Sequence, residues 1–104
     1  MNFDQRVDNA IREMMSLGYK PQAFMTMKIK DGTVNSIKKL INSSTPPEGF
    51  TRLWELKRLD LSMEAIIQEE EWKDLFTDDE RQKAKKRLND YGYKEKDKKK
   101  QIAF

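Results

Sequence analysis

The sequence predicts an all-α fold, a compact orthogonal bundle of five or six short helices followed by a disordered or mobile basic C-terminal tail. Apolar residues recur at the spacing of one helix face along most of the chain. Glycine, proline and capping residues divide this pattern into short segments. A chain of 104 residues has the length of one domain. We therefore expect a single helical domain over residues 1–93 and a charged tail over residues 94–104.

The first helix is expected over residues 3–17, where apolar side chains form one stripe. Gly18 follows this stripe and suits the left-handed backbone that ends many helices. Pro21 then predicts the start of a short helix that reaches about residue 29, because its missing N–H group is not needed in the first turn. Residues 24–30 also alternate partly as a strand would.

A third helix is expected over residues 33–41, after a turn that contains Gly32 and with Thr33 as its cap. The sequence NSSTPPEG that follows is the only clear loop. It separates two groups of helices rather than two domains, because each half of the chain is too small for a core of its own.

Pro47 is expected to open the next helix, which runs to about Arg58 and turns Trp54 toward the core. Ser62 predicts the cap of a further helix that carries the apolar residues 65–67 and weakens through QEEEW.

The last helix is expected over residues 78–91. Thr77 and Glu80 have the spacing of a capping box, in which each side chain bonds the other residue's backbone N–H. Gly92 is expected to end this helix.

The composition excludes several kinds of site. The chain has no Cys and no His, so disulfides, thiolate chemistry and zinc sites built on those residues are absent. We find no motif for a nucleophile, a cofactor or a phosphate-binding loop, and we expect no enzyme activity and no cofactor. The acidic residues of segments 69–74 and 78–80 suit a solvated helix end and a helix N-terminus better than a metal site.

The net charge of +3 comes from the tail. Residues 94–104 contain five Lys and two acidic residues, which is 5 − 2 = +3, so residues 1–93 sum to zero. Nucleic-acid binding is therefore an alternative that depends on the last helix and the tail. The candidate contacts are Lys83, Lys86, Arg87, Lys98, Lys99 and Lys100. A helix-turn-helix over residues 21–42 matches poorly, because Asp31 stands where a buried residue is wanted.

The tryptophans are candidates for interface anchors. Trp54 stands beside Leu and Phe at helical spacing and is expected in the core. Trp72 lies in a polar region and is the better candidate for an exposed anchor. Phe104, in the apolar end QIAF, is a second candidate.

The segment 49–93 carries the pattern G-F-x-x-L-W-E-x-x-R-L-D-L-[ST]-x-E-A, then L-F-[ST]-x-x-E, then R-L-x-x-Y-G-Y. It resembles a small helical domain of unknown function in uncharacterised bacterial and phage-related proteins. The resemblance extends into the preceding LGYKPQAFMTMKIKDGTVNSIKKLI but implies no activity. It directs attention to a structural corner formed by Trp54, Arg58, Asp60, Ser62 and Glu64. There we expect Asp60 or Ser62 to cap a helix and Arg58 to pair with Asp60 or Glu64.

These observations favour a small non-enzymatic protein-interaction module that self-associates or binds a protein partner. A nucleic-acid-associated accessory protein of phage or restriction and defence systems is the alternative. The N-terminal segment lacks the apolar core of a signal peptide, and no apolar run is long enough to span a membrane, so a cytoplasmic location is expected. No small-molecule substrate is indicated.

Overall fold

The structure is a computed structural model that describes residues 1–93, and it confirms the all-α class. The elements are α1 (Phe3–Ser16), α2 (Gln22–Asp31), α3 (Thr33–Ile41), α4 (Glu48–Glu55), α5 (Met63–Ile66) and α6 (Asp78–Asp90), with two 3₁₀ turns, η1 (Leu59–Leu61) and η2 (Glu70–Leu75). No strand occurs within these residues, including the stretch of α2 that alternates in sequence. The expected mobility of the tail concerns residues outside the described range.

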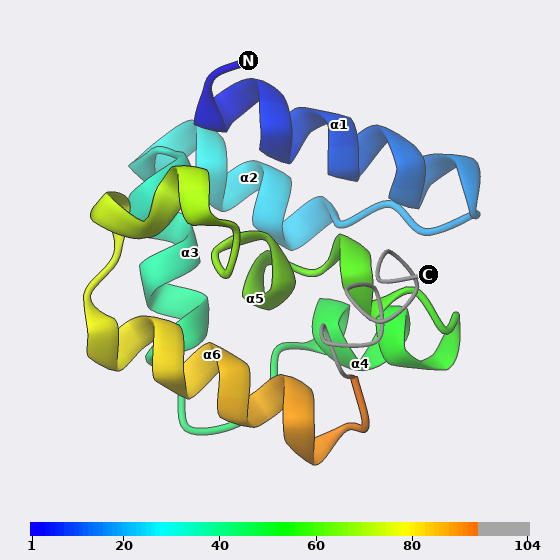
Figure 1. The fold of residues 1–104 in the computed structure, drawn as a ribbon. Coiled ribbons are helices and arrows are strands. Elements are labelled where there is room, and N and C mark those ends of the chain that lie inside the picture. Colours follow the sequence, from blue (N-terminus) through cyan, green and yellow to red (C-terminus); the bar gives the residue numbers. More distant parts are fainter. Residues whose placement is uncertain (94–104) are drawn as a thin grey trace, which may run out of the picture.

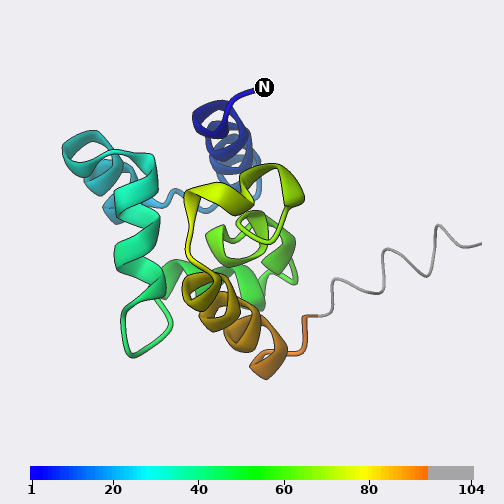
Figure 2. The same cartoon turned by 60° about the vertical axis from the view of Figure 1, so that its left-hand side comes forward.

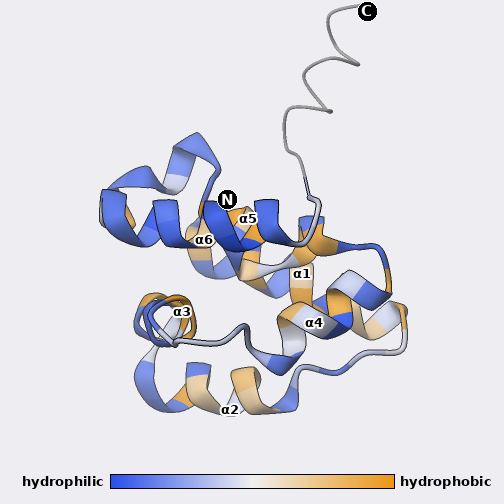
Figure 3. Cartoon of the chain, turned by 90° about the horizontal axis from the view of Figure 1, so that it is seen from below, coloured by the Kyte–Doolittle hydropathy of each residue, from blue (hydrophilic) through white to orange (hydrophobic). Residues whose placement is uncertain are grey.

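Figures 1 and 2 show that α1 and α6 cross the molecule on opposite sides of the short helix α5, and that α3 stands steeply to both. The helices α2 and α3 form a hairpin at one side of the molecule, and α2 packs chiefly against α3. In the view of Figure 3, this hairpin lies to one side of α4. Such steep crossings agree with the predicted orthogonal bundle.

The core lies around α5 and receives side chains from every α-helix. Val7 of α1, Ile37 of α3 and Ile66 of α5 are completely buried. Ile67 follows α5 and is also completely buried. The short helix α5 is thus the centre of the bundle, although four residues are too few to form a stable helix alone.

The predicted helix ends are partly confirmed. Gly18 and Gly92 have φ angles of 90° and 83° and follow α1 and α6 as expected. The capping box before α6 is present in both directions. Thr33, however, is the first residue of α3 rather than its cap, and its hydroxyl donates to the Asp4 carboxylate of α1.

The sequence contains a second capping box that the helical pattern did not reveal. The Asn2 side chain accepts a hydrogen bond from the Gln5 backbone at 2.8 Å, and the Gln5 side chain accepts one from the Asn2 backbone at 2.9 Å. The spacing of three residues between Asn2 and Gln5 is the signal from which this cap is predictable.

Two predicted helices end earlier than expected. The helix expected over 47–58 ends at Glu55, because Lys57 adopts a left-handed backbone with a φ of 61°. The Arg58 N–H then bonds the Leu53 carbonyl at 2.8 Å, which is the closing bond of a Schellman motif. The helix after Ser62 does not fade through 68–72 but stops at Ile66 and gives way to η2.

Glu80 ties α6 to α3. Its carboxylate accepts hydrogen bonds from Lys38 at 2.8 Å, Asn42 at 3.0 Å and the Thr77 backbone at 3.0 Å. Burial acts to raise the Glu80 pKa, but these donors outweigh it and lower the pKa to about 2. The carboxylate therefore stabilises the fold in its charged form.

Replacing Lys57 by Gly is expected to stabilise the protein by about 0.5–1 kcal/mol, because glycine adopts the left-handed backbone without a Cβ penalty. Urea unfolding measures this. Gly92→Lys places a Cβ atom at a left-handed position with a φ of 83° and is therefore expected to destabilise the protein. A less stable Lys57→Gly variant would contradict the interpretation.

Glu80→Gln is expected to remove part of the acid sensitivity of folding. A carboxyl whose folded pKa is lowered contributes stability above its ordinary pKa of 4.5 and loses it as the pH falls to about 2. Urea unfolding of the natural chain should therefore show a falling free energy from about pH 5 to about pH 2, and the variant a flatter decline. Asp79→Asn, at an exposed neighbour in the same turn, is the matched control for the loss of one carboxylate. Equal slopes in the natural chain and in Glu80→Gln would refute the assignment.

Candidate functional site

An apolar groove of about 490 Å³ lies between the α2–α3 hairpin and the α4–α5 region. We call it the hairpin groove. Its apolar lining includes Met14, Phe24, Met27, Phe50, Leu53 and Met63. These side chains come from α1, α2, α4 and α5, so the groove exists only in the folded bundle.

The hairpin groove forms because α2 does not turn a single apolar face toward the body. Phe24 is buried in the core, Met27 lines the groove, and Ile29 is 88% exposed on another face of the helix. A helix with apolar residues on several faces leaves some of them uncovered when it packs against one neighbour. In α2 that neighbour is chiefly α3.

Tyr19 and Gly49 meet at the lining of the groove. A Cβ atom on Gly49 would lie 2.8 Å from the Tyr19 hydroxyl oxygen, so any other residue at position 49 would displace the phenol. Burial raises the pKa of Tyr19, Glu48 adds to the rise, and Arg52 opposes it. The phenol is therefore a neutral hydrogen-bonding group at neutral pH.

Glu64 is the deeply buried ionisable residue of the groove lining. Its carboxylate accepts a hydrogen bond from Arg87 of α6 at 2.9 Å, and the two side chains are only 3% and 11% exposed. Burial raises the pKa of Glu64 against the opposing effect of Arg87. Arg87 also donates to the carbonyls of Leu40 and Ser43 at 3.2 and 3.0 Å.

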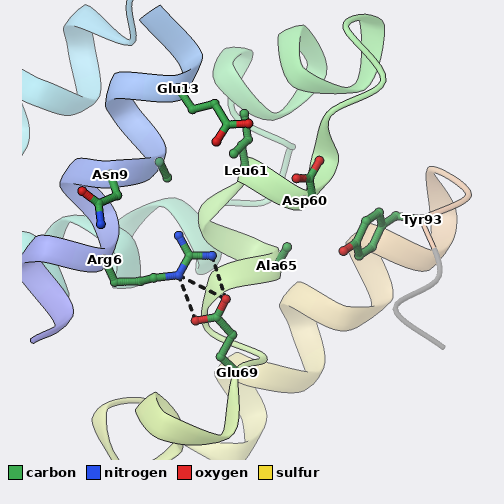
Figure 4. Close-up of a pocket in the computed structure, with 9 residues that line it drawn as sticks. Arg6, Asn9, Glu13, Asp60, Leu61, Ala65, Glu69 and Tyr93 are labelled. Carbon is green, nitrogen blue, oxygen red and sulfur yellow. Dashed lines mark hydrogen bonds and ion pairs between the residues drawn. The ribbon is translucent and has the colours of Figure 1, made fainter. Parts of the chain in front are cut away.

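A second hollow, of about 200 Å³, is polar and lies between α1 and the segment from η1 to Glu69 (Figure 4). Arg6 donates to both carboxylate oxygens of Glu69 at 3.0 and 2.7 Å. Glu13 and Asp60 at its other end both accept hydrogen bonds from Arg58. Each of the charged residues that line this hollow thus belongs to an ion pair.

Among residues 1–93, no group of three or more His, Cys, Asp or Glu side chains is arranged to hold a metal ion. In the same range, no helix has the length and apolar character required to cross a membrane.

The candidate nucleic-acid contacts on α6 have partners within the protein. Lys83 pairs with Asp79 at 3.3 Å, and Lys86 pairs with Asp90 at 3.0 Å. Arg87, a third proposed nucleic-acid contact, belongs to the buried pair, and its side chain is only 11% exposed. The remaining candidates, Lys98, Lys99 and Lys100, lie outside the described residues.

The helix-turn-helix interpretation of residues 21–42 also fails to present a free helix. The helix α3 packs against α2 and α6, with Ser36, Ile37 and Ile41 buried. Its Lys38 pairs with Glu80 at 2.8 Å, and its Lys39 pairs with Asp31 at 2.8 Å.

The predicted burial of the two tryptophans is wrong in both cases: Trp72 is buried and Trp54 is exposed. Trp72 is 8% exposed, its ring packs edge-on against Phe3 at 5.3 Å, and its indole N–H donates to Glu69 at 2.8 Å. Its polar sequence neighbours concealed this burial, which needs the 3₁₀ backbone of η2 and the distant ring of Phe3. The other proposed anchor, Phe104, lies outside the described residues.

Trp54 is 48% exposed and does not belong to the core. Phe50 and Leu53 point inward from α4, and the residue after Leu53 is rotated by about 100° around the helix. The Trp54 ring instead packs edge-on against Tyr91 at a centroid distance of 5.5 Å.

The structural corner is partly as expected. Arg58 pairs with Asp60 at 3.0 Å, and Ser62 caps α5 by accepting from the Ala65 N–H at 3.2 Å. Arg58 also donates to Glu13 of α1, which the sequence did not suggest. Glu64 is not its partner, because the carboxylate points to Arg87 instead.

Replacing Arg87 by Met is expected to lower the free energy of unfolding by roughly 3–5 kcal/mol, because it leaves Glu64 charged, buried and unpaired. Glu64→Gln should cost far less, since Arg87 keeps its carbonyl acceptors. Urea unfolding of both variants and of the double variant Glu64→Gln/Arg87→Met measures the coupling. Equal losses in the two single variants would show that the pair does not act as described.

The comparisons with known proteins leave the site to be interpreted from its geometry: no protein-family model, no curated protein and no solved structure matches the chain.

Proposed function

We propose that this protein is a small, non-enzymatic protein-interaction module that binds an apolar segment of a partner in the hairpin groove. The single observation that carries the proposal is the groove itself, an apolar concavity of about 490 Å³. Ligand-binding concavities commonly have volumes of about 300–1,000 Å³ with mainly apolar walls.

The side chains of the groove favour a protein segment. Three of the six methionines of the chain, Met14, Met27 and Met63, line it. Methionine is flexible and polarizable, and it recurs on surfaces that adapt to the apolar faces of partner helices. The walls of the groove are helices, a setting in which an amphipathic helix docks by its apolar residues. An amphipathic helix is therefore the segment that suits the groove.

The polar groups of the groove support a binding role over a catalytic one. The Ser62 hydroxyl donates to the Leu59 carbonyl at 2.7 Å and accepts the cap bond of α5. Glu64 is engaged by Arg87. Each of these two groups already has a structural partner, and neither has a general base beside it.

Nucleic-acid binding stays a prediction that depends on the charge of residues 94–104. The ion pairs of Lys83 and Lys86 favour the protein-binding proposal over it.

The methionine methyl groups provide the test. A synthetic amphipathic helix of Leu and Lys, titrated into protein labelled with ¹³C at the methionine methyls, is expected to shift Met14, Met27 and Met63. Met1 and Met15 do not line the groove and serve as internal controls. A peptide of the same composition in scrambled order is the ligand control.

Met27→Lys is expected to abolish these shifts, because it places a charge in the groove. Met15→Lys, at an exposed position outside the groove, should leave them intact. Shifts confined to Met1 and Met15, or no shift with the helical peptide, would refute the proposed function.

A further inference from the structure

The α2 helix carries an apolar side chain that is not covered by any of the residues that the structure describes. Ile29 is 88% exposed, the highest value among the exposed large hydrophobic residues of residues 1–93. Met25 precedes it by one helical turn and lies on the same face, so the two form a short apolar ridge. Met25 is partly buried against the core, whereas Ile29 projects freely.

We propose that the partner segment is α2 of a second copy of this chain, with Ile29 inserted into the hairpin groove. The inference rests on the proposed function, because it uses the same groove. The occupant of the groove is then Ile29 of α2, which stands between Lys28 and Lys30. A protruding apolar side chain and an apolar groove on the same molecule can contact each other between two copies.

Charge complementarity supports this occupant. Lys30 stands beside Ile29 and is exposed, and Glu48 belongs to the groove lining. Within residues 1–93, neither Lys30 nor Glu48 forms an ion pair, although most charged residues around them do. Insertion of Ile29 into the groove of another copy brings a free cation on α2 toward a free carboxylate at α4.

The position of Ile29 relative to the groove decides the symmetry of the contact. Met27 lines the groove, and Ile29 is two residues further, which is about 200° around a helix. A chain therefore cannot fill its own groove with its own Ile29. Ile29 and the groove point in different directions, so the contact is head-to-tail rather than two-fold, and each copy leaves one Ile29 and one groove for the next.

Sedimentation velocity of the full-length chain tests the proposal. The mean mass is expected to rise with concentration between about 10 µM and about 1 mM, the range of weak specific contacts. Ile29→Asp should weaken association at least about tenfold, because it removes the central anchor. This side chain is already in solvent, so the variant should keep the near-ultraviolet circular dichroism of the natural chain. Met15→Asp, at another exposed apolar residue, is the matched control and should associate normally.

A charge exchange tests the register of the contact. Lys30→Glu and Glu48→Lys should each weaken association, and the double variant should recover it, because the pair is then restored between copies with opposite sign. Lys85→Glu, at an exposed position of α6, controls for the change in net charge. Failure of the double variant to recover would overturn the proposal.

The outcomes separate this inference from the proposed function. A natural chain that stays monomeric over the whole range, yet shows the groove methionine shifts with the helical peptide, overturns self-association and leaves the module intact. Association that survives Ile29→Asp also overturns the inference, because it assigns the contact to another surface. Loss of both association and methionine shifts refutes both proposals.

Discussion

The buried ion pair between Glu64 and Arg87 is the contact on which the arrangement of the helices depends. Arg87 reaches from α6 to Glu64 of α5 and, with its other N–H groups, to carbonyls at the end of α3. One guanidinium thus binds a buried carboxylate and two backbone carbonyls at the C-terminal end of α3. Such a pair contributes little net stability over an apolar substitute, but it joins α5, α6 and the end of α3 through one side chain.

The same placement explains why α5 can be so short. Four residues do not form a helix in water, because the nucleation cost is not recovered. In this protein Ser62 caps the first turn, Arg87 holds Glu64, and Gln68 donates to the Arg81 carbonyl of α6 at 2.9 Å. Polar contacts with α6 therefore hold the central element, and its apolar residues fill the core.

The hairpin groove follows from unequal attachment of the two hairpin helices. The helix α3 is joined to α6 by Lys38, Asn42 and Arg87. The helix α2 depends mainly on α3, with one ion pair from Lys28 to Asp8 of α1. Because α2 packs mainly against α3, space remains between α2 and α4, and apolar side chains line it. The proposed binding role therefore belongs to a region that the core does not need to fill.

The sequence by itself determined the helical class, most helix starts and the ends at Gly18 and Gly92, because these depend on groups within four residues of one another. It did not determine which tryptophan is buried. Trp72 is covered by Phe3 from the other end of the chain, and one residue of rotation exposes Trp54. Only the tertiary structure decided the partner of Glu64 and the existence of the groove. Both require side chains from separate helices to converge, and such convergence leaves no periodic pattern in the sequence.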